Sequence, residues 1–306
     1  MRKYELDLND IFPKIKTITS PICSTKEFKD VIKSMKTQSA PGPTSQPKAL
    51  FSYLFDILPK FSTAAFNKLF LINIEDSPFS FLKKRKFCGI HKKDTDPHIK
   101  ENYRPISLLE VSYKILSKAL NKKITPYLNK ICHSDQFGFI PKKHMATASI
   151  SITALMNYIK SKNTDAQLIF FDLKQAFDKT LYEVSDRIIK HIFPEGNFAE
   201  AWCNLTNGGN FYAVVNGHNS QSFTLKQGFG QGDPSSGSKF DIYMHLFIAC
   251  LKSPKLRHLT LSIKEKPLPS IAFADDSMQA FNLSTEHFSG KSPTRYFSLC
   301  GHGNQL

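Results

Sequence analysis

Apolar residues recur every three or four positions along much of the chain, a spacing typical of helices that bury one face. Prolines and glycines mark where these stretches stop. A Pro-Gly-Pro loop at residues 39–44 follows the first stretch, and Pro126 breaks or kinks the third. The spacing predicts helices at residues 26–35, 50–70, 111–132, 146–159, 176–190 and 236–251.

Short apolar runs between the helices predict strands. Residues 81–110 are basic and are expected to form short strands. The apolar run at residues 167–171 is followed directly by Asp172. Two later runs would form a hairpin that turns at Asp275 and Asp276. Pairing this hairpin with the earlier run would bring Asp172 and Asp275 to one edge of a sheet. The later strands are expected at residues 211–217, 222–225, 270–274 and 277–281.

The chain is strongly basic, with 41 Lys and Arg residues against 26 Asp and Glu and a net charge of +15. Its 306 residues, 41% of them hydrophobic, suffice for one large core or two modest ones. This excess of positive charge attracts polyanions, of which nucleic acid is the commonest. On charge alone, a basic protein without a dedicated partner stays open as the alternative.

Six scattered cysteines without a Cys-x-x-Cys pair argue against a disulfide framework or a zinc site, and they fit a reducing compartment. The N-terminus lacks the apolar run of a signal peptide, and no stretch reaches the length of a membrane span. We therefore expect a soluble intracellular protein, cytoplasmic and/or nuclear.

Three acidic segments follow one another: FDLKQAFD at residues 171–178, QGDP at residues 231–234 and FADD at residues 273–276. Two divalent ions roughly 4 Å apart can stabilise the attacking and leaving oxygens of phosphoryl transfer, and carboxylates suit such ions. Each segment alone has a simpler explanation, because an Asp-Asp pair often lies in a turn and Asp178 could stabilise a helix start. Together they suit an enzyme that gathers carboxylates around metal ions.

Further segments flank the acidic ones, with NYRPISLL at residues 102–109 and SDQFGF at residues 134–139. APGP at residues 40–43 and IHKK at residues 90–93 also fit the same series. With these segments in this order, the sequence resembles the reverse transcriptase domain of non-LTR (LINE-type) retrotransposons over roughly residues 30–283. The resemblance implies an RNA-directed DNA polymerase, a nucleotidyltransferase whose partners are an RNA template, a DNA primer and dNTPs.

The resemblance also implies an α+β fold of the right-hand polymerase type, with fingers and a palm, and a small antiparallel sheet backed by helices. Because only thirty residues follow Asp276, we expect a C-terminally truncated domain in which the family's thumb is missing. The expected divisions are an N-terminal helical extension with fingers at residues 1–80, fingers at 81–165, palm at 166–283 and a poorly patterned tail at 284–306.

Residue by residue, the resemblance assigns Asp172 and Asp275 as the principal metal ligands, with Asp276 assisting. The implied cofactor is Mg²⁺, with Mn²⁺ as a substitute. The primer 3′-hydroxyl would attack the α-phosphate of a dNTP, and pyrophosphate would leave. Asp178 and Asp233 would be structural acids at helix starts.

The resemblance assigns Lys92 and Arg104 to the triphosphate, which an arginine can bind through its bidentate fork and a lysine as a point charge. Lys93 is an adjacent alternative to Lys92, and any single lysine of a basic protein could simply be solvated surface.

Three further residues are assigned to the nucleotide pocket. Phe177 matches the position of the family's steric gate, where a bulky ring leaves no room for a 2′-hydroxyl. The alternative for Phe177 is ordinary core packing. Gln231 and Gly232 would line the pocket at the nascent base pair, where a glycine permits close approach of the backbone.

The chain departs from the family pattern at several positions. Gly230 stands where the family usually has Arg, residues 235–237 read Ser-Ser-Gly instead of Leu-Ser-Pro, and Thr44 replaces a common Asp. These changes concern the handling of the template rather than the metal site. Two alternatives stay open: a catalytically weak or inactive remnant without thumb support that only binds nucleic acid, and a reverse transcriptase of the group II intron maturase type. A longer reading frame would distinguish the retrotransposon type, through an upstream endonuclease, from the intron type, through a downstream maturase segment.

Overall fold

The structure is a computed structural model that describes residues 7–37, 40–99, 102–163, 166–173, 176–215, 217–252, 262–263, 266–267 and 270–282. The tail expected at residues 284–306 lies outside this part of the chain. The chain forms two compact units. Unit 1 comprises Met1–Cys132, Phe139–Pro141 and Lys174–Tyr243, and unit 2 comprises His133–Gly138, Lys142–Leu173 and Met244–Leu306. The division into fingers and palm stays a prediction.

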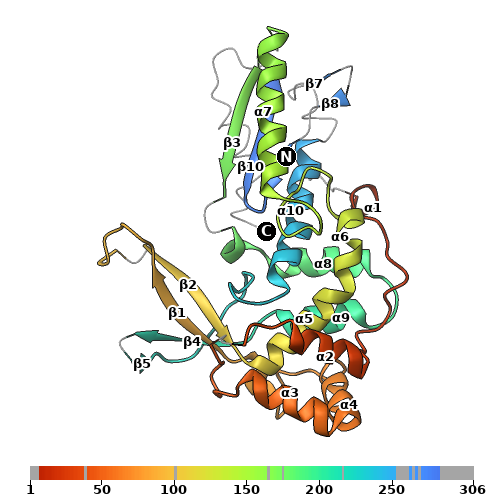
Figure 1. The fold of residues 1–306 in the computed structure, drawn as a ribbon, viewed down its shortest axis with the longest axis vertical. Helices are drawn as coiled ribbons and strands as arrows, with labels where there is room; N and C mark the ends of the chain where they lie inside the picture. Colours follow the sequence, from red (N-terminus) through yellow and green to blue (C-terminus); the bar gives the residue numbers. More distant parts are fainter. Residues whose placement is uncertain are drawn as a thin grey trace. The chain divides into compact units, whose positions relative to one another are not determined.

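Unit 1 begins with short helices, drawn in red to orange in Figure 1, and these pack around aromatic rings. Ser24 caps the second helix through a reciprocal capping box with Glu27. The buried ring of Phe28 contacts the rings of Phe55 and Phe66 at centroid distances of 5.4 and 5.6 Å. The helices are α1 (Leu8–Ile11), α2 (Thr25–Lys33), α3 (Lys48–Ile57) and α4 (Pro59–Leu69).

The single helix predicted at residues 50–70 is wrong, because the chain forms two helices there. Leu58 leaves the helical conformation with ψ of 57°, and Pro59 starts α4 at a position where its missing N–H costs nothing. The predicted break at Pro126 is confirmed, since α5 (Val111–Ile124) gives way to the 3₁₀ turn η3 (Thr125–Tyr127) and then to α6 (Leu128–Ile131).

The helix predicted at residues 176–190 starts later than expected. A short 3₁₀ turn, η4 (Phe177–Lys179), comes first, and α8 (Tyr182–Ile192) follows. The next helix, α9 (Phe198–Thr206), was not predicted. The rings of Phe193, Phe198 and Trp202 form a buried aromatic cluster over these two helices.

The sheet of unit 1 joins segments that are distant in sequence. Strand β1 pairs antiparallel with β2 and parallel with β4, and β4 also pairs with the short strands β5 and β6. The rings of Phe87 and Phe211 stack across β1 and β4 at 5.0 Å. The 3₁₀ turn η1 (Ser80–Lys83) leads into the first of these strands. The strands of this sheet are β1 (Arg85–His91), β2 (Tyr103–Leu109), β4 (Asn210–Val215), β5 (His218–Asn219) and β6 (Phe223–Thr224).

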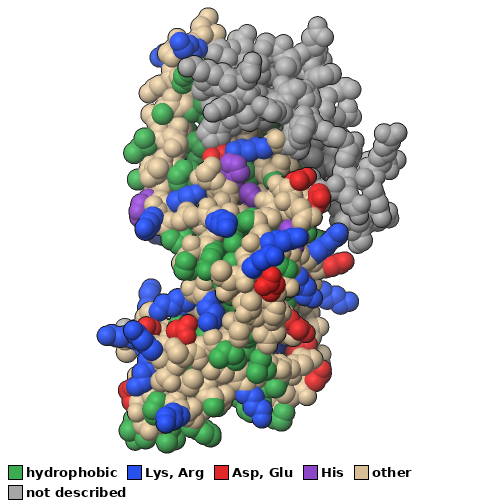
Figure 2. Space-filling model, turned by 90° about the vertical axis from the view of Figure 1, so that its right-hand side faces the viewer, with side chains coloured by type: hydrophobic (Ala, Val, Ile, Leu, Met, Phe, Trp, Pro, Cys, Tyr) green, Lys and Arg blue, Asp and Glu red, His purple; other side chains and the backbone are tan. Residues whose placement is uncertain are grey.

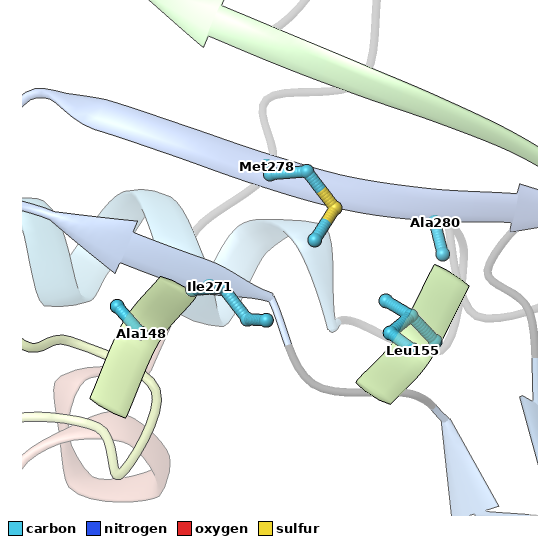
Figure 3. Close-up of a cluster of buried hydrophobic side chains, with 5 residues drawn as sticks. All are labelled: Ala148, Leu155, Ile271, Met278 and Ala280. Atoms are coloured by element: carbon cyan, nitrogen blue, oxygen red, sulfur yellow. The ribbon is translucent and has the colours of Figure 1, made fainter. Parts of the chain in front are cut away.

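Unit 2 contains a three-stranded antiparallel sheet with strand order β3-β10-β9. Figure 3 shows Ala148 and Leu155 of helix α7 pointing toward Ile271, Met278 and Ala280 of the strands, and these five side chains form a buried apolar cluster. The helix therefore backs one face of the sheet. The elements are α7 (Met145–Ser161), β3 (Ala166–Asp172), β9 (Ile271–Phe273) and β10 (Asp276–Asn282), with a separate small hairpin of β7 (Ser262–Ile263) and β8 (Lys266–Pro267).

Helix α10 (Ser236–Leu251) contributes to both units, since the division falls between Tyr243 and Met244. Helices mixed with small sheets agree with the predicted α+β class. Lys and Arg side chains are prominent over the face drawn in Figure 2, with Asp and Glu between them. No helix in the described ranges is both long and apolar enough to span a membrane. Five cysteines fall within those ranges, and all five are free thiols.

Candidate active site

The sheet of unit 2 places two of the predicted carboxylates opposite one another. Asp172 ends β3 and Asp276 begins β10, and the two are register partners in the antiparallel ladder. Directly opposed residues project from the same face with Cβ atoms about 5 Å apart. Both side chains are exposed, and Asp275, which directly precedes Asp276, is half-buried. The expected pairing of the two carboxylate-bearing strands is confirmed, and it sets Asp172 opposite Asp276.

The turn of this hairpin differs by one residue from the prediction. It is formed by Ala274 and Asp275, whereas Asp276 already pairs with Phe273 as part of β10. Ala274 has a φ of 56°, which fits a tight two-residue hairpin but is uncommon for a residue with a side chain. As a result, Asp276 rather than Asp275 lies across from Asp172.

A buried glutamine holds this turn. The side-chain oxygen of Gln136 accepts hydrogen bonds from the amides of Ala274 and Gly138, both at 3.0 Å, and its amide nitrogen donates to the Ala274 carbonyl at 3.3 Å. The main chain adds two bonds, from Phe137 N to Ala272 O at 2.7 Å and from Ala272 N to Asp135 O at 2.9 Å. The SDQFGF segment is thus part of the support of the acidic hairpin.

The close approach of this segment to the Ala274 turn also requires a glycine at position 138. A Cβ atom at this position would lie 2.4 Å from the Ala274 nitrogen and 3.0 Å from its Cα. Backbone atoms cannot give way as a flexible side chain does, so any larger residue would displace the turn.

The exposed carboxylates of Asp172 and Asp276 lie at a cavity of about 310 Å³ whose other walls are mainly apolar. Met145 and Ile152 of α7 and Phe170 of β3 contribute to these walls. The acidic edge is therefore accessible to a bound molecule.

The donor set suits a hard divalent cation. Asp172, Asp275 and Asp276 offer only carboxylate oxygens, which such cations prefer, and the remaining coordination positions can be taken by water or phosphate. In the described part of the chain, no three Asp, Glu, His or Cys side chains lie close enough together to form a complete site by themselves.

In unit 1, the two predicted triphosphate ligands lie near the same end of a two-stranded ribbon. The Lys92 amide donates to the Asn102 carbonyl at 2.7 Å, directly beyond the last pair of β1 and β2. Arg104 lies two residues after Asn102 and pairs with Ile90. Alternate residues of a strand face the same side, so the register puts Lys92 and Arg104 on one face of the ribbon. Lys93 is exposed and next along the chain.

The QGDP turn lies against the middle of β2. The Ser107 amide donates to the Gln231 carbonyl at 2.8 Å. Gly232 has a φ of 116°, and a Cβ there would meet the Ser107 carbonyl oxygen at 2.6 Å. The turn therefore needs glycine both for its conformation and for its approach to the strand.

Asp233 fixes the turn from the inside, which agrees with its prediction as a structural acid. One carboxylate oxygen accepts from the amide and hydroxyl of Ser235, both at 2.9 Å, as at a helix N-terminus. The carboxylate also accepts short hydrogen bonds from the hydroxyls of Tyr113 and Ser117 in α5. Burial, and then the charge of Asp233, raise the pKa of Tyr113 well above its usual value of 10.0, so the phenol remains a proton donor.

A buried arginine completes this arrangement. Arg85 donates to the Tyr113 hydroxyl and the Thr206 carbonyl, both at 3.2 Å. Its guanidinium carbon lies 5.2 Å from the ring centres of Tyr113 and Phe211. A Cβ at Gly230 would lie 2.8 Å from Nη1 of Arg85. The glycine at position 230 therefore leaves room for the guanidinium supplied by β1.

Phe177 lies in unit 1 among other aromatic rings. Its ring stacks on that of Phe240 in α10 at 4.1 Å and meets that of Phe139 edge-on at 6.3 Å. The Phe177 carbonyl accepts from the Phe229 amide at 2.8 Å, which links η4 to the segment before QGDP. Phe177 is half-buried, so its ring both packs and remains partly accessible.

The structure thus forms two groups from the predicted site residues. Unit 2 holds the acidic hairpin and Asp172. Unit 1 holds Lys92 with Arg104 on the β1–β2 ribbon, Gln231 with Gly232 beside β2, and Phe177 next to α10. Their roles remain predictions.

Sequence reasoning did not single out the residues that support these groups. Gln136 had one available signal, its place in the SDQFGF segment. Arg85 and Tyr113 had none, because only the fold brings them to the buried side of the QGDP turn.

Similarity to known proteins identifies the family of the chain. A family model described as "Reverse transcriptase (RNA-dependent DNA polymerase)" matches residues 90–290. The chain is 23% identical over 254 residues to the "Transposon TX1 uncharacterized 149 kDa protein" of Xenopus laevis. This match covers 82% of this chain and 19% of that protein.

Two further relatives are similar over shorter segments. The chain is 22% identical over 185 residues to the "Retrovirus-related Pol polyprotein from type-1 retrotransposable element R2" of Popillia japonica, covering 60% of this chain and 26% of that protein. It is 25% identical over 179 residues to the "Retrovirus-related Pol polyprotein from type-2 retrotransposable element R2DM" of Drosophila melanogaster, and this match covers 58% of this chain and 16% of that protein. The chain therefore spans about a quarter or less of the length of these relatives. Because the family match covers more than half of the sequence, the chain belongs to the reverse transcriptase family, in agreement with its LINE-type resemblance.

Proposed function

We propose that this chain is the polymerase domain of a retrotransposon protein and that it extends a DNA primer on an RNA template. The observation that carries the proposal is the register of β3 and β10, which sets Asp172 opposite Asp276 with Asp275 beside them. Opposed exposed carboxylates repel one another unless cations lie between them, so this edge favours a metal-dependent reaction.

The proposed reaction is a two-metal transfer of a nucleotide to a primer 3′-hydroxyl. Asp172, Asp275 and Asp276 hold divalent ions, for which Mg²⁺ is the natural occupant and Mn²⁺ a substitute. When bound, such ions neutralise phosphate charge and lower the pKa of the attacking hydroxyl. The supported turn of Ala274 keeps the carboxylates in fixed positions, so that little reorganisation is needed during the reaction.

The nucleotide is bound by residues of unit 1. Arg104 and Lys92 bind the triphosphate, and the backbone of Gln231 and Gly232 lies at the nascent base pair. Phe177, whose ring stacks on that of Phe240, excludes a 2′-hydroxyl because the ring leaves no room for this group. The net charge of +15 supports binding to the phosphates of the template and of its hybrid with the primer.

The names of the relatives support a retrotransposon origin over an intron maturase, since all three are described as transposon or retrotransposable-element proteins. The remaining alternative is a remnant that binds nucleic acid without catalysis.

Primer extension by the full chain on an RNA template tests the proposal. We expect dNTP incorporation with Mg²⁺ or Mn²⁺, together with primer–template binding that weakens as salt rises. Salt-dependent binding without incorporation under either metal would instead support the remnant.

A further inference from the structure

Phe139 combines exposure with an unusual backbone conformation. Its side chain is 58% exposed although it is fully apolar, and its φ is 47°. A bulky residue seldom adopts the left-handed region, and such conformations persist only where surrounding contacts enforce them. The position of this ring therefore calls for a reason beyond core packing.

The contacts of Phe139 form an ordered series of three rings within unit 1. Phe240 is buried in α10 with 1% exposure, and the half-buried ring of Phe177 stacks on it at 4.1 Å with 17° between the planes. Phe139 then meets Phe177 at 6.3 Å and 88°, the edge-to-face arrangement that aromatic pairs favour. Phe177 is thus confined by one ring that stacks on it and another that stands perpendicular to it.

Gly237 makes the position of Phe139 possible. A Cβ atom on this second residue of α10 would lie 2.8 Å from Cγ and 2.9 Å from Cδ1 of Phe139. The atoms met are at the base of the ring, so the side chain could not yield by moving only its far end. Any residue other than glycine would push Phe139 away from the helix.

We propose that Phe139 is a positioning residue for sugar discrimination, which keeps the ring of Phe177 in place against the ribose of an incoming nucleotide. This inference rests on the proposed role of Phe177. A ring held only by stacking on Phe240 can slide in its own plane, whereas a perpendicular neighbour opposes that movement. Discrimination against a single hydroxyl depends on such rigidity, because a pocket that yields admits the larger substrate.

Single-nucleotide incorporation by the full chain, with a dNTP or the matching rNTP, tests the inference. Phe177→Ala should reduce the dNTP/rNTP preference by roughly 100-fold or more, and Phe139→Ala by roughly tenfold with little change in dNTP incorporation. Gly237→Ala should act in the direction of Phe139→Ala. The double variant Phe139→Ala/Gly237→Ala should lose no more preference than Phe139→Ala alone, because the methyl group then has no ring to displace.

Phe61→Ala is the matched control, since Phe61 is an exposed phenylalanine of α4 at 71% exposure and should leave the preference unchanged. If Phe177→Ala itself keeps the preference, the assigned gate is wrong. If Phe177→Ala lowers it while Phe139→Ala and Gly237→Ala do not, the gate stands and the role of Phe139 is wrong.

A measurement independent of activity separates these outcomes further. In urea unfolding, the losses of stability from Phe139→Ala and Phe177→Ala should be non-additive in the double variant, as expected for residues in contact. Additive losses would overturn the inference whether or not the chain incorporates nucleotides.

Discussion

Gln136 holds the main chain of Ala274 on both sides of the residue, since its side chain accepts from the Ala274 amide and donates to the Ala274 carbonyl. The glutamine is fully buried, and Ala274 forms the strained turn that leads into Asp275. Two segments that are 138 residues apart are thereby joined at the acidic hairpin.

Replacing Gln136 by leucine should therefore destabilise the hairpin without opening a large cavity. The amides of Ala274 and Gly138 would both lose their acceptor, and the unfolding free energy should fall by about 2–4 kcal/mol. Urea unfolding measures the loss, and hydrogen exchange should show faster exchange at these two amides. Gln221→Ala, at an exposed position, is the control and should change stability by less than about 0.5 kcal/mol. Unchanged protection of the Ala274 amide in Gln136→Leu would contradict the assigned contacts.

The elements of this fold were largely predictable where one physical pattern dominates. Helical spacing located α2, α5, α7 and α10, and the apolar run before Asp172 located β3. The prediction was wrong at residues 50–70 because the apolar spacing continues across Pro59, whereas the helical backbone conformation is interrupted there. It missed α9, whose nine residues make fewer than three turns, so that the helical spacing has little length in which to repeat.

The candidate site residues could be named from the sequence through their motifs, but the residues that hold them in place could not. Asp172 and Asp275 stand out because each follows an apolar run of strand length and the acidic segments occur together in one order. The register that sets Asp276 opposite Asp172 depends on a two-residue turn, and Ala274 gives no glycine or asparagine signal for one. Arg85 and Gln136 act through long-range contacts that the order of the sequence does not contain.

Gly230→Ala should destabilise the protein because the new methyl group would collide with the side chain of Arg85. The new methyl group would lie 2.8 Å from Nη1 of Arg85, and overpacking of this kind costs roughly 1–3 kcal/mol. Adding Gly230→Ala to an Arg85→Ala background should cost much less, because the guanidinium is gone. Urea unfolding of the four proteins gives the comparison. The same cost of Gly230→Ala in both backgrounds would show that Arg85 is not the obstacle.

Arg104→Ala should weaken nucleotide binding more than Arg104→Lys. The lysine keeps the charge but not the planar fork, so the KM for dNTP should rise by roughly tenfold or more for alanine and less for lysine. Arg187→Ala provides a control of equal charge change at an exposed position of α8. Steady-state kinetics at a fixed primer–template concentration measure these values. An equal effect of Arg104→Ala and Arg187→Ala would reduce Arg104 to general surface charge.

Acid should destabilise the protein through His133. Burial lowers the pKa of His133 from 6.5 to about 4. The nearby Asp135 carboxylate opposes this shift by raising the pKa, whereas the Lys252 ammonium lowers it further, with its nitrogen 3.1 Å from Nε2. Between pH 6.5 and 4 the unfolded chain therefore binds a proton that the folded chain does not, so stability falls as the pH falls. The loss should be about 1–2 kcal/mol, since the ring is partly in solvent.

His133→Gln should remove the contribution of this imidazole to the pH dependence of stability, while the carboxyl groups of the protein continue to titrate. The difference in unfolding free energy between the two proteins should change across pH 6.5 to 4 and level off at higher pH. A constant difference over the whole range would mean that His133 titrates alike in the folded and unfolded states.

Asp172 and Asp178 provide the most direct test, because they are two aspartates of one segment with opposite expected roles. Asp178 is half-buried in the short turn η4, where burial raises the pKa of its carboxyl, and its predicted role is structural. Single-nucleotide incorporation on an RNA template should fall by roughly 100-fold or more in Asp172→Asn, because a ligand charge is lost at the reacting phosphate. Asp178→Asn should stay within about threefold of the unaltered chain. Equal incorporation by the unaltered chain and Asp172→Asn would contradict the account, as would an unaltered chain that incorporates nothing with either Mg²⁺ or Mn²⁺.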